Sequence, residues 1–168
     1  MIIYTDIVTG DELFSDAFDI KEKGAVYEID GKSIVVKKGV DVDIGANASA
    51  EGGDDEGALE EGSEQVIDVV YSGRLQQVSY DKTSYQKYMK GYMKKLATAL
   101  NLDEEADKKF KSEVAADFKR IVAGFKDYEF YTGESLDPEG ALMLLNYRED
   151  GVTPFFTVFK HGLKERKV

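Results

Sequence analysis

The stretch DKTSYQKYMKGYMKKLATALNLDEEADKKFKSEVAADFKRIVAGFK, residues 81–126, indicates the fold class of this chain. Apolar residues recur in it at steps of three and four, first over residues 85–100 and again over residues 110–125. This spacing places them on one face of each of two helices. The lengths predict a first helix over about 82–100 and a second over about 104–125.

The boundaries of these two helices carry capping signals. Asp81 or Ser79 is a suitable N-cap for the first helix, and Asp103 is one for the second. Only the short link 101–103 separates the helices, so we expect them to pack as an antiparallel hairpin over 81–126.

Both flanks of this hairpin have the composition of short β-strands. The predicted runs are 2–8, 26–29, 33–37, 66–71, 75–80, 128–132, 141–148 and 152–160. Asp30-Gly31 and Asp150-Gly151 predict hairpin turns. The runs 66–71 and 75–80 are interpreted as one strand bent at Gly73, and Pro154 predicts a sheet edge because proline donates no ladder hydrogen bond. The order strands, helical pair, strands predicts an α+β fold with a mostly antiparallel sheet.

A second stretch, DVDIGANASAEGGDDEGALEEGSE at residues 41–64, has nine acidic residues, five glycines and no basic or aromatic residue. It cannot bury enough apolar surface to offset its ordering entropy. We therefore expect a flexible acidic loop over 40–65, inside a single domain that spans 1–168.

This acidic loop indicates calcium binding as one interpretation, because Ca²⁺ prefers hard oxygen ligands such as carboxylates. The candidate ligands are Asp41, Asp43 and Glu51. Gly45 falls at the wrong position for an EF-hand, so the site would be weak, and a merely solvated loop is the alternative.

Composition excludes several function classes. The net charge is −11, and most of it lies in the acidic loop, so the remaining chain is nearly neutral and lacks the basic footprint of a nucleic-acid-binding protein. There is no cysteine, hence no disulfide framework, thiolate zinc site or thiol nucleophile. No signal peptide and no membrane-spanning apolar run is recognised. The single histidine, His161, is interpreted as an exposed turn residue, and no catalytic motif occurs. We therefore expect a protein that is not an enzyme and needs no cofactor.

The first helix contains lysines and no acidic residue between Lys82 and Leu100. The lysines are Lys82, Lys87, Lys90, Lys94 and Lys95. They predict either a solvated helix face or a docking strip for acidic protein surfaces such as tubulin tails. A third interpretation is an internal contact with the acidic loop, which would weaken with salt.

Several segments resemble one known family. Residues 44–51, IGANASAE, look like a first signature, with Ala48 where proline is usual. Residues 125–135, FKDYEFYTGES, followed by Asp137-Pro138, look like a second. The chain is similar from end to end to the translationally controlled tumour proteins, also called histamine-releasing factors. The signature residues carried over are Ile44, Gly45, Ala46, Asn47, Ser49, Glu51, Gly133 and Glu134.

The resemblance implies a tent-like β fold with a projecting helical hairpin, similar to the Rab-release factors. Those proteins hold zinc on cysteines, which this chain lacks. The family is cytoplasmic and partly cytoskeleton-associated, and it binds calcium, microtubules, translation elongation factors and small Ras-like GTPases. It is also linked to growth control and to anti-apoptotic survival.

The resemblance places GTPase contact at Glu12 and Glu134, and microtubule and calcium association around 81–126. Three hypotheses follow, and the first is favoured because no catalytic constellation occurs: a non-enzymatic interaction protein. The alternatives are an exchange or release factor acting through Glu12 and a calcium buffer. Glu12 could instead only solvate a turn, Glu134 could tie down the loop that follows it, and Gly133 could serve backbone conformation. A monomer is the expected oligomeric state.

Overall fold

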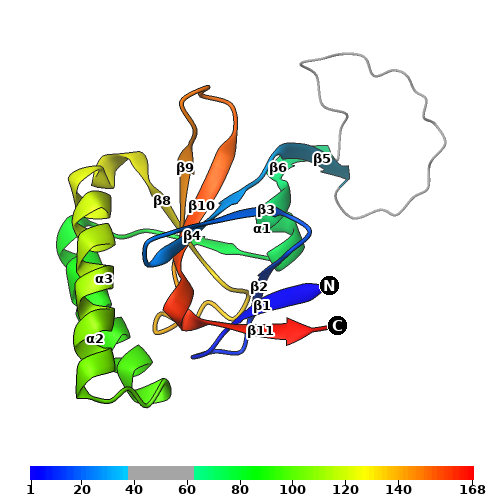
Figure 1. The fold of residues 1–168 in the computed structure, drawn as a ribbon. Helices are drawn as coiled ribbons and strands as arrows, with labels where there is room; N and C mark the ends of the chain where they lie inside the picture. Colours follow the sequence, from blue (N-terminus) through cyan, green and yellow to red (C-terminus); the bar gives the residue numbers. More distant parts are fainter. Residues whose placement is uncertain (38–62) are drawn as a thin grey trace.

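The computed structural model describes residues 1–37 and 63–168, and it arranges these residues in three sheets beside a helical hairpin (Figure 1). The first sheet has the order β11–β1–β2, formed by Leu163–Lys167, Ile2–Asp6 and Glu12–Ser15. The second has the order β3–β4–β10–β9–β8–β7. Its strands are Asp19–Lys23 (β3), Val26–Asp30 (β4), Pro154–Phe159 (β10), Met143–Tyr147 (β9), Glu129–Thr132 (β8) and Gln76–Val78 (β7).

The third sheet pairs β5 (Ser33–Lys37) with β6 (Ser63–Ile67). All strand pairs among the described residues are antiparallel. The expected α+β fold is therefore confirmed. The predicted loop 40–65 lies outside the described residues except for 63–65, which belong to β6 and not to a loop.

The helical hairpin forms as its periodicity predicts, from α2 (Lys82–Ala99) and α3 (Glu104–Ala123) (Figure 1). The Asp81 side chain accepts from the Ser84 N–H at 2.7 Å, and the Ser84 hydroxyl accepts from the Asp81 N–H at 3.0 Å. Asp103 accepts from the Ala106 N–H at 2.7 Å. Each helix start thus gains partners for backbone donors that would otherwise have none.

An aromatic layer joins this hairpin to the six-stranded sheet. Tyr85 of α2 is fully buried. Its ring centroid lies 5.8 Å from Phe118 of α3 and 5.4 Å from Phe130 of β8. Aromatic side chains bury large apolar areas, so this contact fixes the hairpin against the sheet.

The hairpin turn predicted at Asp30-Gly31 is wrong. The β4 strand pairs with β3 and β10, whereas β5 leaves to pair with β6. The turn types of two-residue hairpins need positive φ, and Gly31 is not among the residues with positive φ. A Cβ on Gly31 would lie 2.7 Å from the Asp68 side chain, so close packing explains the glycine. The hairpin predicted at Asp150-Gly151 is confirmed between β9 and β10.

The bent strand predicted over 66–80 is also wrong, because its middle forms the helix α1 (Asp68–Gly73). Val69 of this helix is fully buried. Tertiary packing overrides the β propensity of the Val-Val-Tyr run. Strands flank it on both sides, β6 before and β7 after.

Pro154 does not lie in an edge strand, since β10 lies between β4 and β9. Proline is tolerated because it is the first residue of β10. Its carbonyl accepts from the Gly31 N–H at 2.9 Å.

Three strands were not predicted, namely β2, β3 and β11. Two of them, DIKEK and LKERK, are dominated by charged residues and lie at sheet edges. Lysine on an edge strand discourages pairing with other chains. The β11 strand also brings the termini together (Figure 1), where the Val168 N–H donates to the Met1 carbonyl at 2.9 Å.

Candidate functional site

The turn between β1 and β2 presents Glu12. Within it the Asp6 N–H donates to the Asp11 carbonyl at 2.9 Å, and the Gly10 N–H donates to the Asp6 carbonyl at 2.8 Å. Gly10 has a φ of 82°, which glycine adopts without strain. Glu12 is the first residue of β2, and its side chain is exposed.

Glu134 follows β8 and is brought to this turn by Asp11. The Asp11 carboxylate accepts from the Ser135 hydroxyl at 2.6 Å and from the Ser135 N–H at 3.2 Å. A Cβ on Gly133 would lie 2.4 Å from the same carboxylate. Gly133 is thus required by close approach, not by a positive φ, and Asp11, not Glu134, ties down this loop by these bonds.

Asp6 holds the far end of the same loop. It is 2% exposed and accepts from the Ala141 N–H at 2.7 Å and from the Val8 N–H at 2.8 Å. Two aspartates of one turn therefore fasten both ends of residues 135–141. The buried Asp6 carboxylate and the partly exposed Asp11 carboxylate each accept from backbone N–H groups of this loop, so the site is held in place before any partner binds.

The third wall of the site comes from the end of α1. A Cβ on Gly73 would lie 2.3 Å from the Leu13 carbonyl oxygen, so α1 and β2 approach each other as closely as backbone allows. Arg74 caps α1 with φ 52° and ψ 41°. Its Nη1 lies 3.1 Å from Glu134 Oε2.

These three segments enclose a groove of about 480 Å³. Its lining residues are Gly10, Asp11, Glu12, Ser72, Gly73, Arg74 and Glu134. We name this feature the acidic groove, because its lining holds three carboxylates and one guanidinium. The structure thus brings Glu12 and Glu134 together, and it adds Asp11 and Arg74, which sequence reasoning missed as site residues.

A second arginine reaches the rim of the acidic groove. Arg166 of β11 forms an ion pair with Glu12 through Nη2 and Oε2. The pairing depends on β11 lying beside β1, where Arg166 is opposite Ile3. No local pattern in the sequence signals this contact, because its two ends lie near opposite termini.

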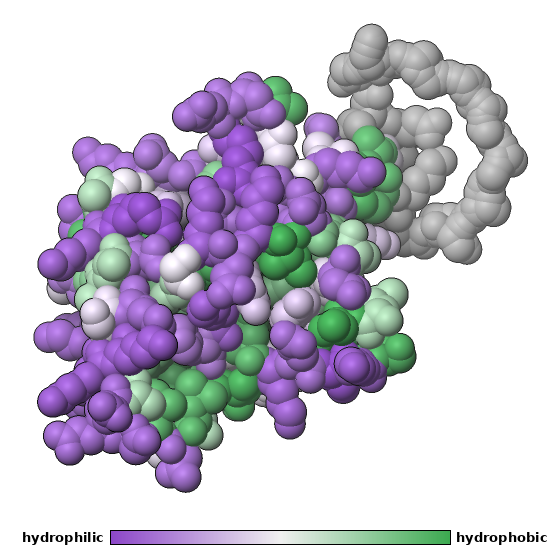
Figure 2. Space-filling model, viewed as in Figure 1, coloured by the Kyte–Doolittle hydropathy of each residue, from purple (hydrophilic) through white to green (hydrophobic). Residues whose placement is uncertain are grey.

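The predicted lysines occupy different positions on α2. Lys87, Lys90 and Lys94 follow one another at steps of three and four, opposite the buried face that includes Tyr85 and Met89. All three are exposed. Figure 2, viewed with α3 in front of α2, shows a mainly hydrophilic surface over α3 and a group of apolar residues at the lower end of the hairpin. We call these three residues the lysine strip.

The other two predicted lysines are exposed but lie apart from this strip. Lys82 is the first residue of α2. Lys95 forms an ion pair with Glu139, which belongs to the loop that also carries Glu134. The hairpin is thereby linked to this loop, as it is by the Tyr88 hydroxyl, which donates to the Gly140 carbonyl at 2.6 Å.

The candidate calcium ligands Asp41, Asp43 and Glu51 lie outside the described residues, as does the first signature at 44–51. Among residues 1–37 and 63–168, no group of three His, Asp or Glu side chains is placed to hold a metal ion. The described helices include none that is long and apolar enough to cross a membrane.

His161 is not the exposed turn residue expected from the sequence. It lies in a short 3-10 helix, Lys160–Gly162, and its side chain is only 20% exposed. The ring packs edge-on against Phe110 at 4.8 Å, and Nε2 lies 3.5 Å from Glu113. Burial lowers the pKa of His161 and outweighs the opposing attraction of Glu113.

Comparison with known proteins finds relatives that match this chain over its length. A family model described as translationally controlled tumour protein matches residues 1–164. A translationally-controlled tumor protein homolog of Debaryomyces hansenii is 53% identical over 171 residues and covers 100% of both chains. One of Candida albicans is 50% identical over 170 residues with the same coverage. The solved structure of the translationally controlled tumor-associated protein p23fyp of Schizosaccharomyces pombe has a TM-score of 0.80 at 48% identity, with 100% of both chains covered.

Proposed function

Because this chain belongs to the translationally controlled tumour protein family, whose members are not enzymes, we propose that it is a cytoplasmic interaction protein. Its principal partner is a small Ras-like GTPase that docks on the acidic groove. The observation that supports this role is the meeting of Glu12 and Glu134 at one groove.

The chemistry of the acidic groove suits such a partner. GTPases present basic side chains and Mg²⁺-linked switch segments, to which carboxylates are complementary. The groove is preorganised by Asp6 and Asp11, so little ordering cost falls on association. Its polar lining favours a charged protein surface over an apolar small molecule.

The test is an NMR titration of the isotopically labelled full-length protein with a GDP-loaded small Ras-like GTPase. We expect saturable shifts at the Gly10, Gly73 and Gly133 amides. Glu12→Gln and Glu134→Gln should each weaken binding roughly two- to fivefold, the range for an exposed ion pair. Glu149→Gln, which changes an exposed glutamate in the β9–β10 turn, is the matched control. Equal affinity for wild type and both groove variants would reject the proposal.

Regulation of nucleotide exchange is the sharper form of the same proposal. If the groove competes with switch residues or Mg²⁺, a stoichiometric amount of protein should accelerate GDP release, and Glu12→Val should abolish the effect. Release measured with a fluorescent nucleotide decides this. If neither wild type nor Glu12→Val accelerates GDP release, the protein docks on the GTPase but does not act as an exchange factor.

Microtubule association is a second candidate, favoured by the outward position of the lysine strip. Acidic tubulin tails are complementary to three exposed ammonium groups on one helix face. Reversing charge at Lys90 and Lys94 should weaken co-sedimentation with microtubules and preserve the helical circular dichroism. The control reverses Lys108 and Lys111 on α3. Unchanged pelleting of the Lys90 and Lys94 variant would exclude the strip.

Calcium binding and association with translation elongation factors follow from the sequence and the resemblance alone. For calcium, saturable binding that Asp41→Asn, Asp43→Asn and Glu51→Gln abolish would support a weak site or buffer. A linear, salt-sensitive response would indicate counterion condensation on carboxylates instead.

A further inference from the structure

Both glutamates of the acidic groove are already paired with arginines of this chain. Arg74 contacts Glu134, and Arg166 contacts Glu12. The four side chains are 73%, 58%, 54% and 55% exposed in that order. Water screens pairs of this kind, so they form and open readily.

The backbone at Arg74 supplies an independent observation. Arg74 is one of three non-glycine residues with positive φ among the described residues. It stands at the C-cap of α1 in the left-handed conformation, where glycine is the usual residue. An arginine in this conformation carries more backbone strain than a glycine would, so Arg74→Gly removes the guanidinium without straining the helix end.

The surroundings direct Arg74 across the groove. Gly73, the last residue of α1, leaves no room for a Cβ against the Leu13 carbonyl. The helix end is therefore fixed on β2, the strand that begins with Glu12. Glu134 is fixed in turn by the contact of Asp11 with Ser135. The guanidinium and the carboxylate are thus held opposite each other from two rigid supports.

We propose that Arg74 and Arg166 are internal competitors, which occupy Glu134 and Glu12 until a partner displaces them with basic groups of its own. The inference rests on the proposed function in that it names the chemistry of the docking partner. That partner presents arginine or lysine side chains to both glutamates. An acidic or apolar protein surface would not displace the two guanidinium groups.

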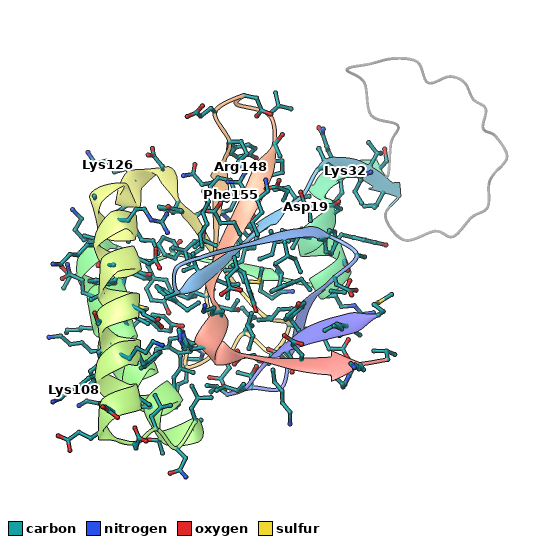
Figure 3. The ribbon with its side chains drawn as sticks, in the orientation of Figure 1. Asp19, Lys32, Lys108, Lys126, Arg148 and Phe155 are labelled. Carbon is teal, nitrogen blue, oxygen red and sulfur yellow. The ribbon has the colours of Figure 1, made fainter. Side chains whose placement is uncertain are left out.

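The test uses the labelled full-length protein and a blocked tetra-arginine peptide as the probe. Affinity is taken from the Gly10, Gly73 and Gly133 amides, and each variant is compared with wild type, in which the acidic stretch 41–64 is the same. Arg74→Gly removes the guanidinium and relieves the backbone, and Arg166→Gln removes the other competitor. Each should tighten binding roughly two- to fivefold. Lys108→Ala, which removes one positive charge on the outer side of α3 (Figure 3), should not.

Weaker or unchanged binding in both arginine variants would overturn the inference. The same variants are then measured against the GDP-loaded GTPase. If Glu12→Gln and Glu134→Gln weaken GTPase binding while Arg74→Gly and Arg166→Gln leave it unchanged, the inference fails and the proposed function survives. If the arginine variants bind the peptide more tightly but the glutamate variants bind the GTPase normally, the inference about Arg74 and Arg166 is supported. The proposal that a GTPase docks on the acidic groove is then rejected.

Discussion

Two arginine–carboxylate clusters in this molecule share their chemistry and differ in burial. Arg148, at the end of β9, donates to Glu28 Oε1 at 2.6 Å and, through Nε, to Asp30 Oδ1 at 2.9 Å. Its guanidinium carbon lies 3.8 Å from the Phe155 ring centroid (Figure 3). Glu28 is 4% exposed, whereas Glu134 opposite Arg74 is 58% exposed. Burial, not the identity of the pair, separates a contact that holds the sheet from one that can be exchanged.

The pKa of Asp30, in the buried cluster, depends both on burial and on its basic partners. Burial by itself would raise the pKa of Asp30, but hydrogen bonds from Arg148 and from Lys21 outweigh it and lower that pKa. A carboxylate whose pKa is lowered by folding stabilises the fold above its ordinary pKa of 3.8. That contribution is lost as the pH falls through the lower, folded-state value.

The largest expected effect comes from breaking the buried cluster. Arg148→Met should destabilise the protein by about 3–5 kcal/mol, because it leaves Glu28 buried with a weaker partner, Lys23, at 3.6 Å. Urea unfolding followed by circular dichroism measures the loss. Arg74→Met, the same change in the exposed cluster, should cost less than about 1 kcal/mol. Similar losses in the two variants would contradict the comparison.

An intermediate effect is expected at the support of the acidic groove. Asp11→Ala removes both acceptor contacts to Ser135 and should cost about 1–3 kcal/mol. It should also speed hydrogen exchange of the Ser135 amide, since that donor loses its partner. Asp11→Asn, which keeps an acceptor oxygen, should lose less. Unchanged Ser135 exchange in Asp11→Ala would mean that the loop is held by other contacts.

A smaller change in stability is expected from breaking the Arg166–Glu12 ion pair at the acidic groove. Arg166→Gln should alter the free energy of unfolding by about 0.2–1 kcal/mol at low salt, because both side chains are more than half exposed. The difference from wild type should shrink at high salt. A salt-independent loss above this range would show that Arg166 supports the fold and is not a displaceable competitor.

The smallest expected effect on stability concerns His161. The burial of its side chain is intermediate between those of Glu28 and Glu134. Its folded-state pKa is below the ordinary value of 6.5, so the unfolded chain binds a proton first as the pH falls. Stability should therefore decline below about pH 6.5, and His161→Phe should decline less. The chain has one histidine, so its ring signal in an NMR titration is unambiguous. A midpoint at or above 6.5 would show that Glu113 outweighs burial.

Local patterns predicted the parts of the fold whose determinants lie within one turn of helix or one hairpin. The helical periodicity over 81–126 and the caps Asp81 and Asp103 needed only neighbours three residues away. The β9–β10 hairpin likewise followed from Asp150-Gly151. The same reasoning failed at Gly31 and Gly73, where close contact with segments distant in the sequence leaves no room for a side chain.

The candidate site divides in the same way. Glu12 and Glu134 were predicted through the resemblance, and the groove that unites them was not. Asp11 binds Ser135, which is 124 residues further along the chain. Arg74 lies at the end of α1, which was predicted as a strand, and Arg166 lies in β11, which was not predicted. No spacing rule in the sequence encodes such meetings.

The sequence by itself determined the α+β class, the helical pair and the acidic character of 41–64, because composition and periodicity are properties of the chain alone. Its signature segments, by their resemblance, indicated the family. Only the tertiary structure decided the strand order, the buried Arg148 cluster and the acidic groove. These depend on which segments approach one another, and that is settled by the burial of many side chains together and by long-range pairing, not by any local preference.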